Sequence, residues 1–525
     1  MIKKHQARDY ENSQEEIVNF LVNSDALSPG PVQHIQTHIS HIFLAEDRAY
    51  KMKRAVSMNF ADLRQREQRQ AASMNELRLN RRTTPGLYLG WRGIYKPETE
   101  LQLSELRTDI DEITHQEPLE CLVVMQRFDE RDLLSNRLQA NDLPPHTLDA
   151  LCEEVIAFHR SAEPRPDCGG FSAMLDNVGN IRTNLETFGR HHISAEQVTH
   201  WYKRVASQLQ DHADLLDHRR EQGFVRQCHG DLHLANAFMD GDQPRLFDCI
   251  DFSDELACID VLYDLAFLLM DLMYNGLHAE TSAVLNRYLA ATRDYQATAL
   301  LPLYVSIRAA IRAMVAAIEA AEKPQAQNHI RSAQAHFELA VACLRERPAA
   351  QIIAVGGYSG TGKSTLAKEI ASAAPLHTFI LSSDVIRKRQ LGVMPEQNLP
   401  KTAYDSARSA AVYDQLAADT ETLLRTKAVI IADATFLQAE GRRQLERIAE
   451  DLNTPFNGFW LDLPLETALQ RTANRVYDPS DADADVLHKQ RKESPGVINW
   501  VKLDASAPGL ADLVLASIPL DREPI

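Results

Sequence analysis

The sequence lacks the features of a secreted or membrane-spanning protein. Its seven cysteines are an odd number without a Cys-x-x-Cys pair, which argues against a disulfide framework and favours a reducing cytoplasm. The polar start of the chain has no apolar signal-peptide core. The most apolar stretch, 261–274, is interrupted by Asp264 and Asp271 and is too short to cross a bilayer. We therefore expect a cytoplasmic protein without a membrane partner.

An excess of positive charge is also absent. The net charge is −17 and the isoelectric point is near 5.6, so general electrostatics would repel DNA or RNA. No basic-aromatic track, solenoid repeat or long low-complexity tract is present. The sequence thus predicts no nucleic-acid partner, but it leaves room for a nucleotide, whose phosphates loops and metal ions hold locally.

What the chain does contain is enough apolar sequence for several cores. It has 525 residues, of which 44% are hydrophobic and 25% charged, as in ordinary globular proteins. The amino-acid composition and periodicity change near residue 345, where an alanine-rich helical region is followed by a very apolar predicted strand. With Pro348 as a breaker, we place domains at 1–345 and 351–525, joined by a linker at 346–350.

The second domain alternates short apolar runs with helical patterns. This alternation predicts a parallel sheet with helices on both faces, which is an α/β sandwich. The predicted strands are Ile352–Val355, Thr378–Leu381, Ala428–Ala432, Gly458–Leu461 and Trp500–Leu503.

The clearest motif follows the first of these strands. Residues 357–364 fit the phosphate-loop pattern G-x-x-x-x-G-K-[ST] and lead into a helix. Such glycines let backbone N–H groups surround phosphates, while Lys363 reaches the terminal phosphates and the Ser364 hydroxyl ligates Mg²⁺. The predicted ATP contacts are Gly357, Ser359, Gly360, Thr361, Gly362, Lys363, Ser364 and Thr365.

Charged residues at later strand ends complete this predicted site. Asp433 ends a strand where it could hold the Mg²⁺ shell, and Asp384 could accept the acceptor's proton. Arg471 and Arg475 are four apart on a helical pattern and could close over the triphosphate.

Residues 351 to about 505 resemble the small P-loop kinases, the group of gluconate kinase, chloramphenicol phosphotransferase, zeta-toxin kinases and polynucleotide kinase. The resemblance implies that ATP is the phosphoryl donor. It also implies that Asp384 and Arg387 bind the acceptor. The alternative for these side chains is a set of surface ion pairs.

A second motif lies in the first domain. Residues 228–236 read CHGDLHLAN, with a histidine, an aspartate and an asparagine at the spacing of a kinase catalytic loop. Asp231 would orient the acceptor hydroxyl and Asn236 would hold Mg²⁺. A strand then ends at Asp248, with Asp251 as the alternative metal ligand, and the aspartates of 260–264 could brace the loop.

Residues of about 30–345 resemble the aminoglycoside phosphotransferase–choline kinase type of domain. The resemblance implies a two-lobed, protein-kinase-like α+β fold, with an adenine-binding hinge near 125–128. It also implies a strand lysine that grips phosphates, Lys51 in preference to Lys53, and a helix glutamate as its partner, Glu76.

C-terminal helices line the acceptor pocket in that family. The resemblance therefore gives Arg308 and Arg312 as binders of an anionic acceptor. A packing helix with solvated arginines is the alternative.

Together these features predict an α/β multidomain protein with two fused kinase modules that use ATP and Mg²⁺. Each would phosphorylate a hydroxyl of a small molecule, and their fusion suggests the hypothesis of sequential steps on one compound. The rival interpretations are a protein kinase or autokinase, and a nucleotide-sensing regulatory ATPase.

Overall fold

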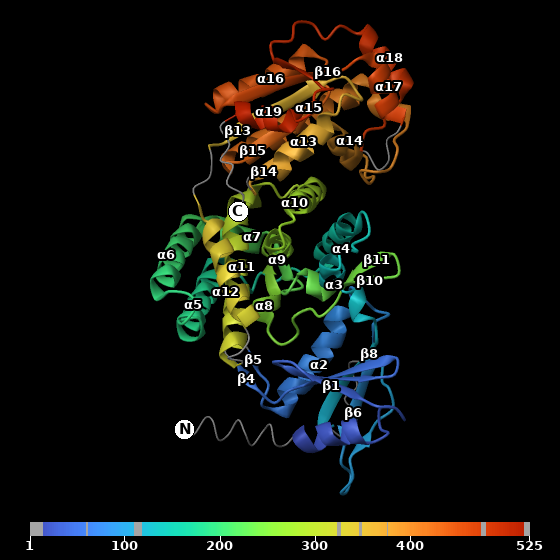
Figure 1. Ribbon diagram of the computed structural model, residues 1–525, viewed down its shortest axis with the longest axis vertical. Coiled ribbons are helices and arrows are strands. Elements are labelled where there is room, and N and C mark those ends of the chain that lie inside the picture. Colours follow the sequence, from blue (N-terminus) through green and yellow to red (C-terminus); the bar gives the residue numbers. More distant parts are fainter. Residues whose placement is uncertain are drawn as a thin grey trace. The chain divides into compact units, whose positions relative to one another are not determined.

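The computed structural model describes residues 14–58, 61–109, 118–322, 327–345, 349–374, 376–473 and 479–518 (Figure 1). They form two compact units, one of residues 1–174 with 213–268 and the other of 175–212 with 269–525. Most of the predicted linker at 346–350 lies outside the described residues, and the domain boundary there stays a prediction.

The first unit opens with a six-stranded antiparallel sheet in the order β1-β2-β3-β8-β6-β7. The helix α2, Arg66–Asn80, packs against β8 and β3. Lys51 and Lys53 alternate with the buried Met52, so both lysines face α2. The strands are β1 Gln33–Gln36, β2 Ser40–Ala45, β3 Arg48–Lys53, β6 Tyr88–Tyr95, β7 Gln102–Leu103 and β8 Glu120–Gln126, with a small β4 Ser57–Met58 and β5 Ala61–Asp62 pair alongside.

Short strands and helices follow in this unit and carry the catalytic-loop motif. Strand β9 leads into the motif and pairs with β12, while β10 and β11 form a hairpin directly after it. The bounds are α3 Leu134–Gln139, α4 Thr147–Ser161, α7 Ala213–Glu221, β9 Val225–Gln227, β10 Ala237–Asp240, β11 Gln243–Leu246, α8 Asp254–Ala257, β12 Cys258–Asp260 and α9 Val261–Tyr274, the last continuing into the second unit.

The helical part of the second unit is built on alanine-rich, buried helices. Within it, α11 and α12 pack along each other, and the Trp201 indole donates a hydrogen bond to the Ser306 hydroxyl at 3.0 Å. The helices are α5 Gly170–Phe188, α6 Ala195–Asp211, α10 His278–Thr292, α11 Leu301–Glu322 and α12 Gln327–Ala342.

One stretch in this region, Gln296–Ala321, is long and apolar enough to cross a membrane by length and composition alone. However, 72% of the apolar 18-residue window within this stretch is buried inside the protein. Packing against neighbouring helices therefore accounts for its apolar composition. It is a different stretch from 261–274, which the sequence marked as most apolar.

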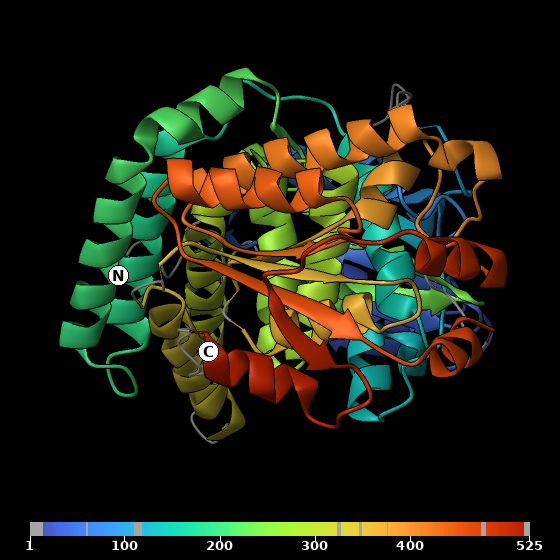
Figure 2. The same cartoon turned by 90° about the horizontal axis from the view of Figure 1, so that it is seen from above.

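The C-terminal part is a five-stranded, all-parallel sheet in the order β14-β15-β13-β16-β17. Helices α15 and α16 cover one face, and α13 and α19 cover the other (Figure 2). The predicted strands and their parallel arrangement are confirmed. The strands are β13 Gln351–Gly357, β14 Thr378–Ser382, β15 Val429–Asp433, β16 Phe456–Asp462 and β17 Val501–Asp504.

The central strand β13 is buried along its whole length, as expected for a parallel strand covered on both faces. It ends at the phosphate loop, where α13 begins. The helices are α13 Lys363–Ser372, α14 Ser383–Gln390, α15 Ser406–Arg425, α16 Ala439–Asp451, α17 Leu465–Ala473, α18 Ala484–Lys492 and α19 Leu510–Ser517.

Candidate active sites

Five charged side chains from three distant segments meet in the first unit. The Lys51 ammonium lies 2.9 Å from a Glu76 oxygen and 2.5 Å from an Asp248 oxygen. The Lys53 ammonium lies 2.8 Å from the other Glu76 oxygen and 2.5 Å from an Asp251 oxygen. The predicted pairing of Lys51 with Glu76 is thus confirmed, and Glu76 holds both lysines at once.

Burial separates this cluster into an inner and an outer half. The Asp251 side chain is 3% exposed and that of Lys53 is 1% exposed, whereas that of Asp248 is 41% exposed. The outer pair of Lys51 and Asp248 is therefore the one that a ligand can reach.

The charges of the cluster shift the pKa values of its acids in opposite directions. Burial alone would raise the pKa of Glu76, but the two lysines outweigh it and lower that pKa to about 2. Burial, together with the negative charge of Glu76, raises the pKa of Asp251 to about 7 against the opposing pull of Lys53. With two ammonium groups and three ionised carboxylates, the cluster would carry a net charge of −1. Protonation of Asp251 would neutralise this excess charge.

One buried carboxylate fixes the backbone at the start of the catalytic-loop motif, 228–236. Asp264, on α9, accepts hydrogen bonds from the backbone N–H of His229 at 3.0 Å and of Gly230 at 2.9 Å. Its side chain is fully buried and also lies 3.1 Å from the His159 ring nitrogen. The predicted bracing role is confirmed for Asp264, but Asp260 instead pairs with Arg219 at 2.6 Å.

Two further constraints fix the loop's path. Gly230 has a φ of 84°, and a Cβ there would come within 2.9 Å of the Leu256 carbonyl oxygen, so only glycine fits. The His229 ring nitrogen Nε2 lies 2.9 Å from the Phe247 carbonyl oxygen, which ties the loop to the segment just before Asp248.

The two polar residues of the motif contact each other. The Asn236 amide donates to an Asp231 carboxylate oxygen at 2.9 Å, and the His233 ring nitrogen lies 3.3 Å from the same carboxylate. The amide oxygen of Asn236 takes no part in this contact. An amide and a carboxylate oxygen at this spacing are a donor set that suits Mg²⁺.

The backbone of Asp248 is left-handed, with a φ of 62°, which is uncommon for a residue other than glycine. Its N–H donates to the Tyr88 hydroxyl at 3.2 Å, and the next N–H, of Cys249, donates to the Asn80 side chain at 2.8 Å. Tyr88 and Asn80 therefore hold the turn that directs the Asp248 carboxylate to Lys51. No motif marks these two positions, so sequence reasoning missed them.

The phosphate loop lines a cleft of about 1520 Å³ in the C-terminal part. Typical single-ligand pockets measure about 300–1,000 Å³, so this cleft has room for a nucleotide and a second small molecule. Gly357, Gly360 and Gly362 have positive φ values, as the curled loop requires. Gly357 ends β13, and the other predicted loop contacts, from Ser359 to Thr365, all line the cleft.

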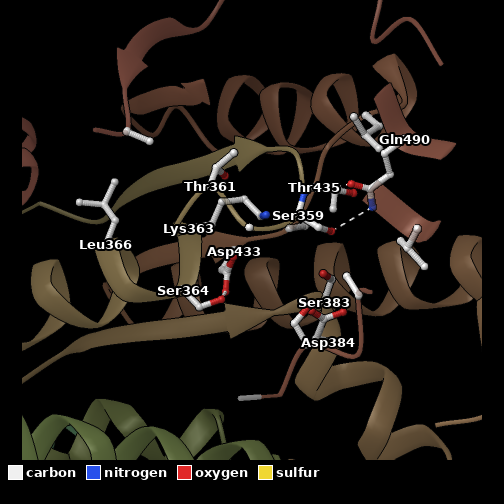
Figure 3. A pocket seen from close by; sticks show the side chains of 18 of the residues that line it. Ser359, Thr361, Lys363, Ser364, Leu366, Ser383, Asp384, Asp433, Thr435 and Gln490 are labelled. Atoms are coloured by element: carbon white, nitrogen blue, oxygen red, sulfur yellow. Dashed lines mark hydrogen bonds between the residues drawn. The ribbon is translucent and has the colours of Figure 1, made fainter. Parts of the chain in front are cut away.

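The two residues predicted to ligate Mg²⁺, Ser364 and Asp433, lie close together. The Ser364 hydroxyl donates to an Asp433 carboxylate oxygen at 2.7 Å, and Figure 3 shows these side chains pointing toward each other. Hydroxyl and carboxylate oxygens beside a phosphate loop fit Mg²⁺ chemistry. Lys363 donates from Nζ to the Tyr358 carbonyl at 2.9 Å.

The predicted acceptor residues lie at the start of α14. Asp384 is in its first turn, two residues beyond the end of β14 rather than at the strand end itself. Withdrawal from water, and then the charge of Asp433, raise the pKa of Asp384. Arg387 is 7% exposed and lines the same cleft.

The predicted arginine lid is described only in part. Arg471 lines the cleft, and its guanidinium nitrogen Nη1 lies 3.6 Å from where a Cβ of Gly362 would be. Arg475 lies outside the described residues. A residue without any motif signal, Gln490 on α18, contacts the loop instead: it accepts from the Ser359 N–H at 2.9 Å and donates to the Ser359 hydroxyl at 3.0 Å.

The arginines of α11 have two different environments. Arg308 is 4% exposed, whereas Arg312 is partly buried, and burial together with the Arg312 charge lowers the pKa of His336. The alternative of fully solvated arginines is thus excluded for Arg308. Binding of an acceptor by Arg308 and Arg312 stays a prediction.

All seven cysteines are free, in agreement with the expected absence of disulfides. One of them, Cys228, forms a group with His159 and Asp264 that is compact enough to hold a metal ion. The Asp264 oxygens already accept from two backbone N–H groups, however, so bracing the loop explains this group.

Two family profiles match the chain. The phosphotransferase enzyme family matches residues 93–301, which include Asp231, Asn236 and Asp248 but not Lys51 or Glu76. An AAA domain profile matches residues 352–495, which include the whole phosphate loop, Asp384 and Asp433.

Individual proteins resemble the chain more distantly. An uncharacterised protein of Mycobacterium tuberculosis is 28% identical over 471 residues, which are 86% of this chain and 88% of that protein. A choline/ethanolamine kinase family protein from Mesorhizobium loti covers 63% of this chain and 95% of its own, with 13% identity and a TM-score of 0.38. A gluconokinase from Sinorhizobium meliloti covers 33% and 90%, with 22% identity and a TM-score of 0.22.

The phosphotransferase profile covers the catalytic-loop part of the N-terminal site, and the AAA profile covers the phosphate-loop site. The chain therefore carries a domain of the phosphotransferase enzyme family followed by a P-loop kinase-like domain.

Proposed function

We propose that the chain is an ATP-dependent phosphotransferase with two modules, each of which transfers the γ-phosphoryl group to a hydroxyl of a small molecule. The observation that supports this most directly is the convergence of Lys51, Glu76 and Asp248 from three distant segments. This is the arrangement that phosphate binding needs in a kinase-like site.

In the N-terminal module, Lys51 would hold the nucleotide phosphates, with Glu76 keeping its ammonium in place. Asp231 would orient the acceptor hydroxyl and take its proton. Asn236 and Asp248 would hold Mg²⁺, and Asp251 would serve as an internal partner of Lys53 rather than as a ligand. Bound Mg²⁺ would neutralise the charge that develops on the phosphates.

In the C-terminal module, the N–H groups of 359–364 and Lys363 would hold the ATP phosphates, and Arg471 would approach from the side of α17. Ser364 and Asp433 would hold Mg²⁺. Asp384 would accept the hydroxyl proton, because its raised pKa makes it a stronger base than an ordinary carboxylate. Its acceptor would be a second compound or the product of the first module.

Transfer from γ-labelled ATP to a panel of sugars, nucleosides, amino alcohols and aminoglycosides tests this proposal. We expect Asp231→Ala to lower the N-terminal activity about 100-fold or more, the size of a general-base contribution. Lys363→Ala should abolish the C-terminal activity alone. Asp240→Ala and Lys368→Ala, at exposed positions near each motif, are the matched controls.

The rival functions give different results in the same experiment. Label on the chain itself, seen by intact-protein mass, would identify an autokinase. Lys363-dependent ATP hydrolysis without any phosphorylated product would identify a regulatory ATPase.

A further inference from the structure

One short segment of the C-terminal part, 479–493, contacts both ends of the cleft. It consists of a turn followed by α18, and residues from both of these parts line the cleft. Its first residues contact α14, the helix that carries Asp384, and its last residues contact the phosphate loop. No motif in the sequence accounts for this segment.

The Asp481 carboxylate joins α14 to the stretch 391–404 that follows this helix. One of its oxygens lies 3.0 Å from the Lys388 ammonium on α14. The other accepts from the Leu399 N–H at 3.0 Å and from the Tyr404 hydroxyl at 2.7 Å. The Asp481 side chain is 7% exposed and that of Lys388 is 1% exposed. An unpaired buried ammonium would be costly, so this ion pair fixes Asp481 beside α14.

These contacts lie in the half of the cleft that would receive the acceptor. Tyr404 lines the cleft, and the Arg387 guanidinium lies 4.6 Å from the centre of its ring. The Ser480 hydroxyl forms a hydrogen bond with the Asp384 carboxylate. Ser480 and Asp481 therefore hold both the proposed base and the part of the cleft wall beside it.

The other end of the segment holds the phosphate loop. Gln490 accepts from the Ser359 N–H at 2.9 Å and donates to the Ser359 hydroxyl at 3.0 Å, a bond that Figure 3 marks with a dashed line. The guanidinium of the next residue, Arg491, lies 4.1 Å from the centre of the Tyr358 ring. Helix α18 begins three residues after Asp481 and includes Gln490. Because a helix is a rigid element, a displacement at one of these anchors is transmitted to the other.

We infer that Asp481 and Gln490 are positioning residues through which a nucleotide on the phosphate loop orders the acceptor half of the cleft. The inference rests on the proposed function of the C-terminal module. A bound nucleotide fixes Ser359, and Gln490 and α18 are fixed with it. Asp481 then holds Lys388 and Tyr404 in place. The nucleotide would therefore bind first, and by linkage each ligand would raise the affinity for the other.

The test follows amide hydrogen exchange of 396–405 in the full chain, with and without Mg²⁺ and a saturating non-hydrolysable ATP analogue. We expect the analogue to slow this exchange by roughly fivefold or more, which is the lower end of typical couplings between sites. Gln490→Ala should remove most of this slowing, although it changes the opposite end of the segment. Lys492→Ala, at an exposed position of α18, should keep it.

Two variants test the other anchor. Asp481→Asn should also remove the slowing, but it leaves a buried lysine unpaired and could destabilise the module. Tyr404→Phe deletes only the hydroxyl that donates to Asp481, so it should reduce the slowing without that cost. Calorimetric titration of each variant with the analogue sets the concentration for saturation, and Lys363→Ala identifies the slowing that depends on the phosphate loop.

Equal slowing in the natural chain and in Gln490→Ala would overturn the inference, because the nucleotide would then act without α18. Unchanged exchange in a chain that binds the analogue, or slowing that persists in Lys363→Ala, would overturn it as well. In these cases the proposed phosphotransfer stands. If the analogue does not bind in a Lys363-dependent manner, the proposed function of the C-terminal module fails, and the inference fails with it.

Discussion

At the scale of single residues, the N-terminal site depends on carboxylates that never meet the solvent. Asp264 is fully buried and accepts two backbone N–H groups of the catalytic loop. Such a residue acts through the position of Asp231 rather than by touching a substrate. Its loss should therefore be visible in the loop itself.

We predict that Asp264→Asn loosens the loop, because an amide cannot accept from both N–H groups as a carboxylate does. Leaving one buried donor unsatisfied costs about 1–3 kcal/mol, so amide exchange in 228–231 should become roughly 5- to 150-fold faster. Hydrogen exchange followed by mass spectrometry measures this. Asp176→Asn, at an exposed position of α5, should change nothing, and unchanged exchange in Asp264→Asn would disprove the bracing role.

Asp251 gives a prediction about pH. Its folded-state pKa of about 7 is above the ordinary value of 3.8, because burial disfavours the charged form. Between these values the folded protein keeps a proton that the unfolded chain has lost, so this residue's contribution to stability falls as the pH rises from about 4 to 7.

The variant Asp251→Asn removes this titration. Relative to the natural protein, it should gain stability steadily across that window, by an amount on the order of a few kcal/mol. Denaturant unfolding at several pH values measures the difference. A difference independent of pH would show that Asp251 stays ionised in the folded state.

At the scale of helices and strands, the sequence predicted the C-terminal sheet well. All five strands were expected, because parallel strands are continuous apolar runs and each run is separated by a helical pattern. Asp384 was expected at a strand end and lies instead in the first turn of α14, since Ser383 already begins the helix. A boundary of this kind depends on local capping, which periodicity does not encode.

The two sites were predictable to the extent that motifs mark them. The sequence pattern indicates that Lys51, Lys53 and Glu76 are charged site candidates. It does not indicate that the Glu76 carboxylate contacts both lysines. Tyr88, Asn80 and Gln490 were missed because each acts through a contact between segments far apart in the chain, and no local pattern accompanies them.

One buried aspartate connects three helices of the second unit. Asp419, on α15, is 2% exposed and lies 2.8 Å from Arg293, at the end of α10, and 3.2 Å from Arg389, on α14. Because α14 also carries Asp384 and Arg387, this aspartate helps to fix the helix on which the proposed acceptor chemistry depends.

We predict that Asp419→Asn leaves both arginines without their anion and destabilises the second unit by about 3 kcal/mol. The measurement is the midpoint of thermal unfolding, with exposed Glu421→Gln on the same helix as control. If the two variants unfold alike, the ion pairs contribute nothing net and the helices are held by apolar packing alone.

At the scale of the whole molecule, the P-loop sheet has a protected edge. β14 is one of its two edge strands, and the Ile380 N–H on that strand donates to the Asn286 side chain of α10 at 2.6 Å. Arg287 of the same helix lies 2.7 Å from Glu396. Unpaired strand edges attract other strands, so α10 covers a surface that would otherwise be prone to association.

We predict that a chain of residues 349–525 alone unfolds at a lower temperature than the corresponding transition of the full chain and forms dimers or larger species. Calorimetry and size-exclusion chromatography measure both effects. Asn286→Ala in the full chain, which removes one hydrogen bond worth about 1 kcal/mol, should give a small shift without association. A monomeric fragment of unchanged stability would show that α10 is dispensable.

The contact between Asn286 and Ile380 spans 94 positions of the chain, and its order matters during translation. Domains form as the polypeptide leaves the ribosome, starting from the N-terminal side. α10 is made before β14, so the cover is already present when the strand emerges. During translation, β14 can therefore pack against α10, which has already been synthesised. This edge of the P-loop sheet is covered without later residues or another molecule.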